Sequence, residues 1–276
     1  MEQTETPPQD CECGVHPSVF YLLATLLLTS CSTAMLCAAI MTDHWEHVVW
    51  EHAALAALAN ASNTALQWLL DEKVAKIEEP GRKGGGTFLV PMNGGIWTMC
   101  VSLEEEEVTI LSRAGFPTEP LCTNYLADNE DEEPRADWQH RMQNLSISCA
   151  LVCLIVLGSA ALVGAFGVCK HQISAVLITG VMYLLAGLFA MFTLMIIHFK
   201  RIQRVSSRGS SHGDDTGDGV VGNQAPAIPL LSAREFSTSW SLELGWGGVA
   251  LASLTSLLWI LLSKIMRYNP ISAMLL

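Results

Sequence analysis

Four long runs of the chain carry almost no charged side chains, and no other feature constrains the fold as strongly. The runs are 18–41, 145–168, 173–199 and 240–263, and Glu243 is the only acidic residue within them. Each exceeds the roughly 20 residues that a helix needs to cross a hydrocarbon core about 30 Å thick. A helix buried inside a soluble protein is seldom apolar on every side over such a length. The sequence therefore predicts four membrane-spanning helices.

The composition and the start of the chain agree with this prediction. Half of the 276 residues are hydrophobic and 15% are charged, whereas about 25% charged residues is usual for soluble domains. Residues 1–17 contain no lysine or arginine, and the run that follows is longer than the about 7–15 apolar residues of a signal peptide. We therefore expect a retained first span after an N-terminal tail at 1–17, a short turn at 169–172, and a C-terminal tail at 264–276.

Nearly all of the charge imbalance lies in the loop between the first two runs. Residues 42–144 carry 18 acidic and 7 basic side chains, a balance of −11 in a chain whose formal net charge is −12. Such a surface repels nucleic acid and anionic lipid, so we expect no nucleic-acid partner. A solvated surface is the simpler interpretation of the acidic residues, and a surface that attracts cations is the alternative.

Two cysteines and two sequons indicate the compartment of this loop. Of the nine cysteines, only Cys100 and Cys122 lie in it, and such an isolated pair predicts a disulfide, which needs an oxidising compartment. The same loop holds N-glycosylation sequons at Asn60 and Asn144. Asn144 adjoins the second run, so Asn60 is the expected acceptor. These signals predict a plasma-membrane protein with both long loops extracellular and both termini cytosolic.

The basic residues favour the opposite orientation. Lys200, Arg201 and Arg204 begin the second long loop, 200–239, which lies on the predicted outside. The positive-inside rule places such juxtamembrane bases on the cytosolic side. We give more weight to the cysteine pair and the sequons. Within the second loop, 205–233 is rich in serine, glycine and aspartate, which predicts a flexible segment.

Several short segments of the first loop have the pattern of strands. These segments are 43–52 (DHWEHVVWEH), 87–91 (TFLVP), 95–103 (GIWTMCVSL) and 107–111 (EVTIL). For the first of them, a zinc site that uses His44 and His47 is the alternative. No cysteine or second histidine cluster lies nearby to complete a tetrahedral shell, so a strand that leaves the membrane is the preferred interpretation.

The first loop also contains a segment with helical spacing. Residues 52–78 are rich in alanine and leucine, and the spacing predicts one or two helices that end before Pro80-Gly81. The apolar face of this segment includes Leu66, Leu69 and Leu70. It either covers the sheet or binds a partner.

A motif in the same loop carries a family resemblance. TDHW stands at the end of the first run, NGGIWTMC occupies 93–100, and a second loop cysteine follows. This order resembles the signature of the superfamily of claudins, peripheral myelin protein relatives and calcium-channel gamma subunits. The residues in the signature positions are Trp45, Gly95, Ile96, Trp97, Cys100 and Cys122. The resemblance implies an all-α four-helix membrane bundle with a small extracellular antiparallel β-sheet formed mainly by the first loop.

Departures from the signature place the chain nearer the gamma-subunit branch, and the transmembrane-protein 114 and 178 types, than true claudins. Ile96 replaces the leucine of the signature, and 21 residues lie between the two loop cysteines, a wider spacing than in claudins. The two signature tryptophans also lie farther apart. The start of the fourth run at Trp240-Ser241 resembles the gamma-subunit branch.

The motifs favour a non-enzymatic function. The sequence contains no nucleophile-elbow, phosphate-loop or metalloprotease signature, so we expect neither an enzyme nor a cofactor. The resemblance implies an auxiliary or modulatory subunit of an ion channel or receptor, and a claudin-type junction protein that controls paracellular permeability is the alternative. The candidate residues for binding a membrane-protein partner are Leu66, Leu69, Leu70, Lys200, Arg201 and Arg204. Residues 274–276 also partly match the C-terminal pattern that a PDZ groove binds.

Overall fold

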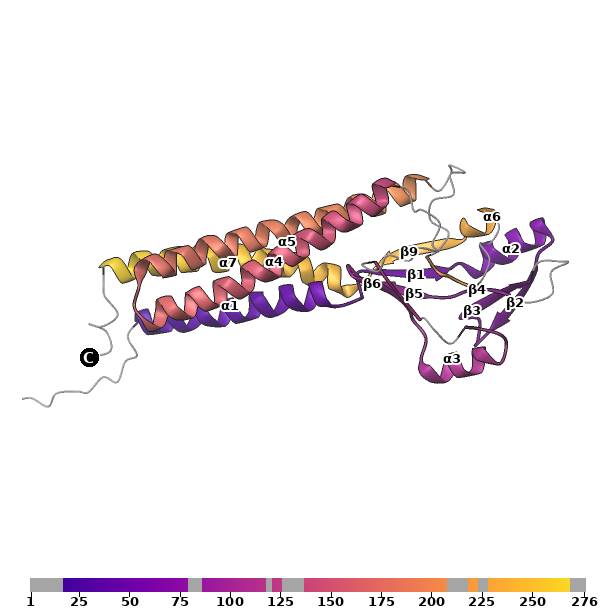
Figure 1. Ribbon diagram of the computed structural model, residues 1–276, viewed down its shortest axis with the longest axis horizontal. Coiled ribbons are helices and arrows are strands. Elements are labelled where there is room, and N and C mark those ends of the chain that lie inside the picture. Colours follow the sequence, from indigo (N-terminus) through magenta and orange to yellow (C-terminus); the bar gives the residue numbers. More distant parts are fainter. Residues whose placement is uncertain are drawn as a thin grey trace, which may run out of the picture.

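The protein consists of a helical bundle with a domain of strands and short helices at one end (Figure 1). This computed structural model describes residues 17–78, 86–117, 121–125, 137–207, 218–222 and 228–268. Most of the predicted tails, including the PDZ-like C-terminal pattern, lie outside the described residues.

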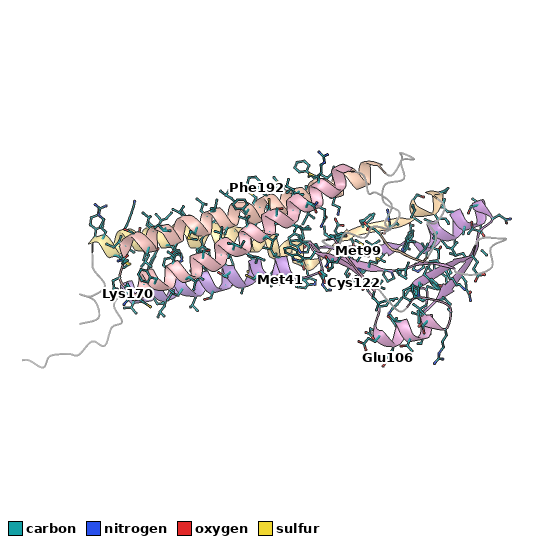
Figure 2. All side chains as sticks on the ribbon, in the orientation of Figure 1. Met41, Met99, Glu106, Cys122, Lys170 and Phe192 are labelled. Atoms are coloured by element: carbon teal, nitrogen blue, oxygen red, sulfur yellow. A yellow bond between two sulfur atoms is a disulfide. The ribbon has the colours of Figure 1, made fainter. Side chains whose placement is uncertain are left out.

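The bundle has four long helices within the described residues: α1 (Pro17–Met41), α4 (Asp137–Cys169), α5 (Ile173–Ser207) and α7 (Trp240–Tyr268). All four are long and apolar enough to cross a membrane. Large apolar side chains point away from the bundle along its length; Phe192, for example, is 52% exposed (Figure 2). The predicted fold of four membrane-spanning helices with a small antiparallel sheet is confirmed in these terms.

Helices α4 and α5 extend furthest beyond the predicted spans. Helix α4 has 33 residues and α5 has 35, which corresponds to about 50 Å each at 1.5 Å per residue. The extensions, 137–144 and 200–207, contain no glycine or proline, so nothing in the sequence stops the helices at the membrane edge. A short turn joins the two helices, and His171 has a positive φ of 52° there.

Hydroxyl and indole groups connect three of the long helices. Thr33 donates a hydrogen bond to the carbonyl of Thr29 and accepts one from the Tyr183 hydroxyl of α5, with an oxygen–oxygen distance of 2.9 Å. The indole N–H of Trp259 in α7 donates to the Thr29 hydroxyl at 2.9 Å. Such contacts hold helices together inside a bilayer, where apolar burial gives little net driving force.

Sheet A has five antiparallel strands and lies next to the bundle. Its strands are β1 (Glu46–Trp50), β5 (Met92–Gly94), β6 (Thr98–Val101), β7 (Cys122–Asn124) and β9 (Arg234–Thr238). Their order is β7-β6-β5-β1-β9. Strand β9 comes from the second long loop, so the two loops meet at the same end of the bundle and form one domain, which we call the sheet domain (Figure 1).

Sheet B has four antiparallel strands and lies farther from the bundle (Figure 1). Its strands are β2 (Ala65–Leu69), β3 (Val74–Glu78), β4 (Thr87–Leu89) and β8 (Val220–Val221), in that order. The short helices of the sheet domain are α2 (His52–Ser62), α3 (Glu105–Ser112) and α6 (Ile228–Leu231).

Two apolar clusters form the core of the sheet domain. The inter-sheet cluster joins both sheets and α3, and its members include Val48, Phe88, Met92, Met99, Val108 and Leu111. The α2 cluster joins α2 and α6 to sheet B, and its members include Trp50, Leu55, Ala59, Ala75, Ile77 and Leu230. Sheet B therefore contributes to both clusters.

The prediction of helix throughout 52–78 is wrong in its second half. Helix α2 ends at Ser62, because Asn63 adopts the left-handed conformation that closes a helix. A β-hairpin follows, and its turn places Leu70, Asp71 and Glu72 at φ values of 53°, 50° and 69°. The local turn and the pairing of β2 with β3 override the helical spacing of the leucines.

The hairpin also divides the predicted apolar face. Leu66 packs against the α2 cluster, whereas Leu69 and Leu70 pack against the inter-sheet cluster. These three residues therefore do not form a single helical surface for a partner.

Two further predictions are corrected. Residues 107–111 belong to helix α3, not a strand, because Glu104 and Glu107 form a capping box at its start. The segment 205–233, predicted to be flexible, includes the end of α5, strand β8 and helix α6. Residues 208–217 and 223–227 of that segment lie outside the described residues.

Candidate interaction site

The signature tryptophans bond to the end of the first membrane-spanning helix. A helix leaves its last four carbonyls without partners inside the helix, and side chains or water must satisfy them. Three side chains donate to carbonyls in the last turn of α1: Thr42 to Ala38, Trp45 to Ala39 and Trp97 to Ile40, at 2.8, 2.7 and 2.7 Å. Two signature residues thus fix sheet A to the end of α1.

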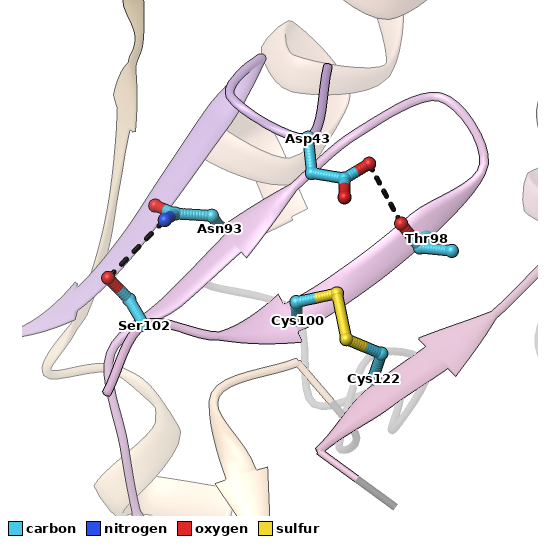
Figure 3. The surroundings of a disulfide bond; sticks show 6 residues. All are labelled: Asp43, Asn93, Thr98, Cys100, Ser102 and Cys122. Atoms are coloured by element: carbon cyan, nitrogen blue, oxygen red, sulfur yellow. Dashed lines mark hydrogen bonds between the residues drawn. A yellow bond between two sulfur atoms is a disulfide. The ribbon is translucent and has the colours of Figure 1, made fainter. Parts of the chain in front are cut away.

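The signature glycine lies where two segments approach closely. A Cβ atom on Gly95 would lie 2.6 Å from Asp43 Oδ1 and 2.9 Å from Asp43 Cα. The same carboxylate accepts a hydrogen bond from the Thr98 hydroxyl at 2.8 Å, and the Gly95 amide donates to the Thr98 carbonyl at 2.7 Å (Figure 3). The absent side chain at Gly95 therefore lets the turn before β6 lie against the end of α1.

Ile96 and Lys200 connect the sheet domain to α4 and α5. The Ile96 side chain is buried, and its carbonyl accepts a hydrogen bond from Gln143 of α4 at 2.7 Å. Lys200 of α5 donates to the Gln143 side chain at 3.0 Å, and its ammonium lies 5.6 Å from the centre of the Tyr125 ring. Lys200, proposed from the sequence as a partner-binding residue, is thus engaged inside the chain.

The other predicted site residues have different outcomes. Arg201 and Arg204 belong to α5, but their side chains lie outside the described residues. Asn60 is exposed in the last turn of α2, where an N-glycan has room, and its glycosylation stays a prediction.

The predicted disulfide is present. Cys100 of β6 and Cys122 of β7 are direct cross-strand partners, with a Cα–Cα distance of 4.0 Å (Figure 3). Strand β7 has three residues and lies at the edge of sheet A. The bond therefore holds a strand that is too short to be stable on its ladder alone.

The disulfide lies in a row of side chains that crosses sheet A. The strand registers pair Ser237 with His47, His47 with Asn93, and Asn93 with Cys100, which is bonded to Cys122. In β1, burial alternates, and His47 lies on the side opposite the buried Val48. This row and the exposed Glu235 form the open face of sheet A.

Hydrogen bonds order the centre of the open face. The Asn93 amide donates to the Ser102 hydroxyl at 3.3 Å (Figure 3), so its oxygen is left to accept from His47 Nδ1 at 2.7 Å. This arrangement assigns the proton to Nδ1 and leaves Nε2 as an acceptor. His44, the other residue of the zinc alternative, packs its ring against Trp240 at 5.5 Å. Among the described residues, no three histidine, cysteine or carboxylate groups gather as a metal site requires.

An ion pair connects sheet B to α3. The Lys73 ammonium, next to the β2–β3 turn, donates to the Glu107 carboxylate. This hydrogen bond, together with one from the Glu104 amide, lowers the pKa of Glu107 below its ordinary value. The same carboxylate raises the pKa of Lys73. Both charged forms are therefore favoured in the folded chain.

Sequence reasoning missed the contribution of the second loop and the role of Gln143. Strand β9, REFST (234–238), has a single apolar residue, so its sequence carries no alternating pattern that identifies it as a strand. No local signal in the sequence identifies Gln143, because its partners come from distant segments.

Comparison with known proteins adds no family to these observations. No family model matches the chain, and no curated protein matches it. The resemblance to the superfamily of claudins and calcium-channel gamma subunits therefore rests on the signature residues.

Proposed function

We propose that this chain is a non-enzymatic four-pass membrane protein that modulates an ion channel or receptor at the plasma membrane, as a member of the claudin and gamma-subunit superfamily. The observation that carries the proposal is the attachment of the open face of sheet A to the ends of two membrane-spanning helices. A partner bound on the open face would thereby contact a surface whose position is coupled to the bundle.

The chain path supports this coupling. Strand β1 begins at Glu46, soon after α1 ends at Met41, and β9 ends at Thr238, just before α7 begins at Trp240. The hydroxyls of Thr42 and Ser241 lie 2.8 Å apart and join the two connections. Because β1 and β9 are neighbours in sheet A, α1 and α7 hold adjacent strands of the same sheet.

The surfaces available to a membrane partner are of two kinds. The open face offers polar groups, including His47, Glu235 and Ser237, at one end of the bundle (Figure 1). The bundle offers apolar side chains such as Phe192, which lipid or the spans of another protein can cover (Figure 2). A multi-pass channel or receptor fits both surfaces at once.

Affinity purification from native membranes, followed by mass spectrometry, tests the proposal. We expect the chain to recover a channel or receptor. The variant Glu235→Arg with Ser237→Arg should lose it, because one reversed charge and one added charge disrupt a polar interface. The variant Glu106→Arg is the matched control, since Glu106 is exposed on α3, away from the open face. Currents of the recovered channel, recorded with and without the chain, then test modulation.

Expression alone in cells without junctions tests the claudin-type alternative. A modulator should distribute over the cell surface and leave paracellular resistance unchanged. Concentration at cell–cell borders, a change in paracellular resistance and no co-purified channel or receptor would together replace the modulator proposal with the junction proposal.

A further inference from the structure

We propose that the edge strand β2 pairs in an antiparallel manner with β2 of a second copy of this chain. An unpaired edge strand presents a row of backbone donors and acceptors, and proteins usually protect such edges with charge, proline, short length or a cover. The described strands leave four sheet edges, at β7, β9, β2 and β8.

Three of these edges are protected. Strand β7 has three residues and is held by the disulfide, and β8 has two residues. Strand β9 carries the exposed Glu235, and a charge on an edge discourages pairing with another chain.

The edge at β2 differs from the other three. Its five residues, ALQWL, contain no charge and no proline, and they pair with β3 in an unbroken register without a bulge. Among the described residues, no hydrogen bond joins 65–69 to anything beyond the β2–β3 ladder, and the ring of Trp68 packs against His52. Ala65 and Gln67 are exposed.

The sequence of β2 is complementary to itself. Two antiparallel copies centred on Gln67 place Leu66 opposite Trp68 and Ala65 opposite Leu69. Aromatic and aliphatic cross-strand pairs stabilise a sheet, and the two Gln67 amides can bond to each other. No like charges meet in this arrangement.

The rest of the sheet domain favours this place for a contact between copies. The first long loop carries most of the negative charge of the chain, so two copies repel each other over much of that surface. Strand β2 lacks charge and lies at the end of the sheet domain remote from the long helices (Figure 1). The helices therefore do not obstruct a second copy. This inference goes beyond the proposed function and does not depend on it.

Cysteine cross-linking of the full-length chain in membranes tests the pairing. In the symmetric arrangement the two copies of Gln67 are direct cross-strand partners, the relation in which Cys100 and Cys122 already form a disulfide. We expect Gln67→Cys to give a covalent dimer on mild oxidation. The control Glu235→Cys, on the protected β9 edge, should give no more dimer than the wild-type chain with its native cysteines. Equal dimer from all three proteins would overturn the proposal, as would a cross-link to a different protein.

A charge variant tests the same contact without cysteine. Gln67 is the cross-strand partner of Lys76, so Gln67→Glu adds an opposite-charge pair within one chain and places two carboxylates together between copies. We expect co-precipitation of two differently tagged copies to fall several-fold. The control Thr109→Glu adds the same charge at an exposed position of α3. Unchanged co-precipitation of Gln67→Glu would contradict the pairing.

A third experiment tests whether an N-glycan at Asn60, near the start of β2, covers the β2 edge. Cross-linking of Gln67→Cys should be equal with and without the further change Asn60→Gln. Cross-linking that occurs only in the absence of the sequon would overturn the proposal and assign the cover to the carbohydrate.

Discussion

The two sheets of the sheet domain differ in what holds their strands in place. Sheet A is fixed by side chains that satisfy the end of α1, by its direct connections to α1 and α7, and by a disulfide. Among the described residues, sheet B contributes neither a disulfide nor a donor to the end of a long helix, and its strands depend on their ladders and the two clusters. Sheet A is therefore anchored to the bundle, whereas sheet B must be stable through its own packing.

Removal of a signature tryptophan should have the largest effect. Trp45 is 3% exposed and donates to the end of α1, so Trp45→Ala should lower the free energy of unfolding by about 3–5 kcal/mol. Thermal unfolding in detergent should show this loss, and hydrogen exchange should accelerate first in β1 and β5. Trp246→Ala is the control, because Trp246 is 44% exposed on α7. An equal loss in the control would contradict the anchoring role.

Removal of the disulfide should loosen sheet A alone. The double variant Cys100→Ser with Cys122→Ser should lose about 3 kcal/mol, the effect expected for a closed loop of this length. Hydrogen exchange should rise in β6 and β7 and stay unchanged in the β2–β3 hairpin. Cys169→Ser, at an exposed free cysteine, should leave both sheets unchanged. Equal loosening of the hairpin would show that the two sheets are not held separately.

A cavity in the α2 cluster should loosen sheet B before sheet A. Leu55 of α2 is fully buried in the α2 cluster, so Leu55→Ala should lower the free energy of unfolding by about 2–3 kcal/mol. Hydrogen exchange should rise in β2 and β3 before it rises in β1. Ile110→Ala, 55% exposed on α3, serves as the control. Faster exchange in β1 than in β2 would contradict the separation of the two sheets.

The bundle and the motif were predictable because their signals are local or simple. Four apolar runs specify four spans without reference to any contact. The two cysteines in one loop predicted their bond, which the structure confirms. The motif identified Trp45 and Trp97 as residues of interest, although the carbonyls that they satisfy could not be read from the sequence.

Only β4 of sheet B lies in a segment that the sequence predicted as a strand, 87–91; turn geometry and pairing with other segments decide the other three strands. The leucines of 52–78 have helical spacing, but the left-handed turn after Leu69 and the ladder with β3 produce a hairpin. Strands β8 and β9 come from the second loop and join sheets formed by the first. Composition predicted that part of that loop is flexible. Strand β8 within it was missed because a two-residue strand gives almost no sequence signal.

The ion pair between the β2–β3 turn and α3 should have the smallest effect, and pH can isolate it. The pKa of Glu107 is lowered in the folded chain, so the pair stabilises the fold at neutral pH and loses this contribution as the pH falls through that lowered pKa. The raised pKa of Lys73 means that the contribution is also lost at high pH, as the lysine deprotonates. The Lys73 side chain is exposed and the Glu107 side chain stays partly accessible to solvent, so the effect is small and weakens with salt.

The variant Glu107→Gln removes the charge and can still accept the hydrogen bond from the Glu104 amide that caps α3. Hydrogen exchange of the β2–β3 turn should therefore be faster in Glu107→Gln than in the wild-type chain at neutral pH. In acid, where the wild-type carboxyl is also neutral, the two proteins should exchange alike. Glu106→Gln, at the exposed neighbouring position, should match the wild-type chain at both pH values. A difference between Glu107→Gln and the wild-type chain that persists in acid would show that the Glu107 side chain acts through packing. The charge of Glu107 would then not contribute to the stability of the β2–β3 turn.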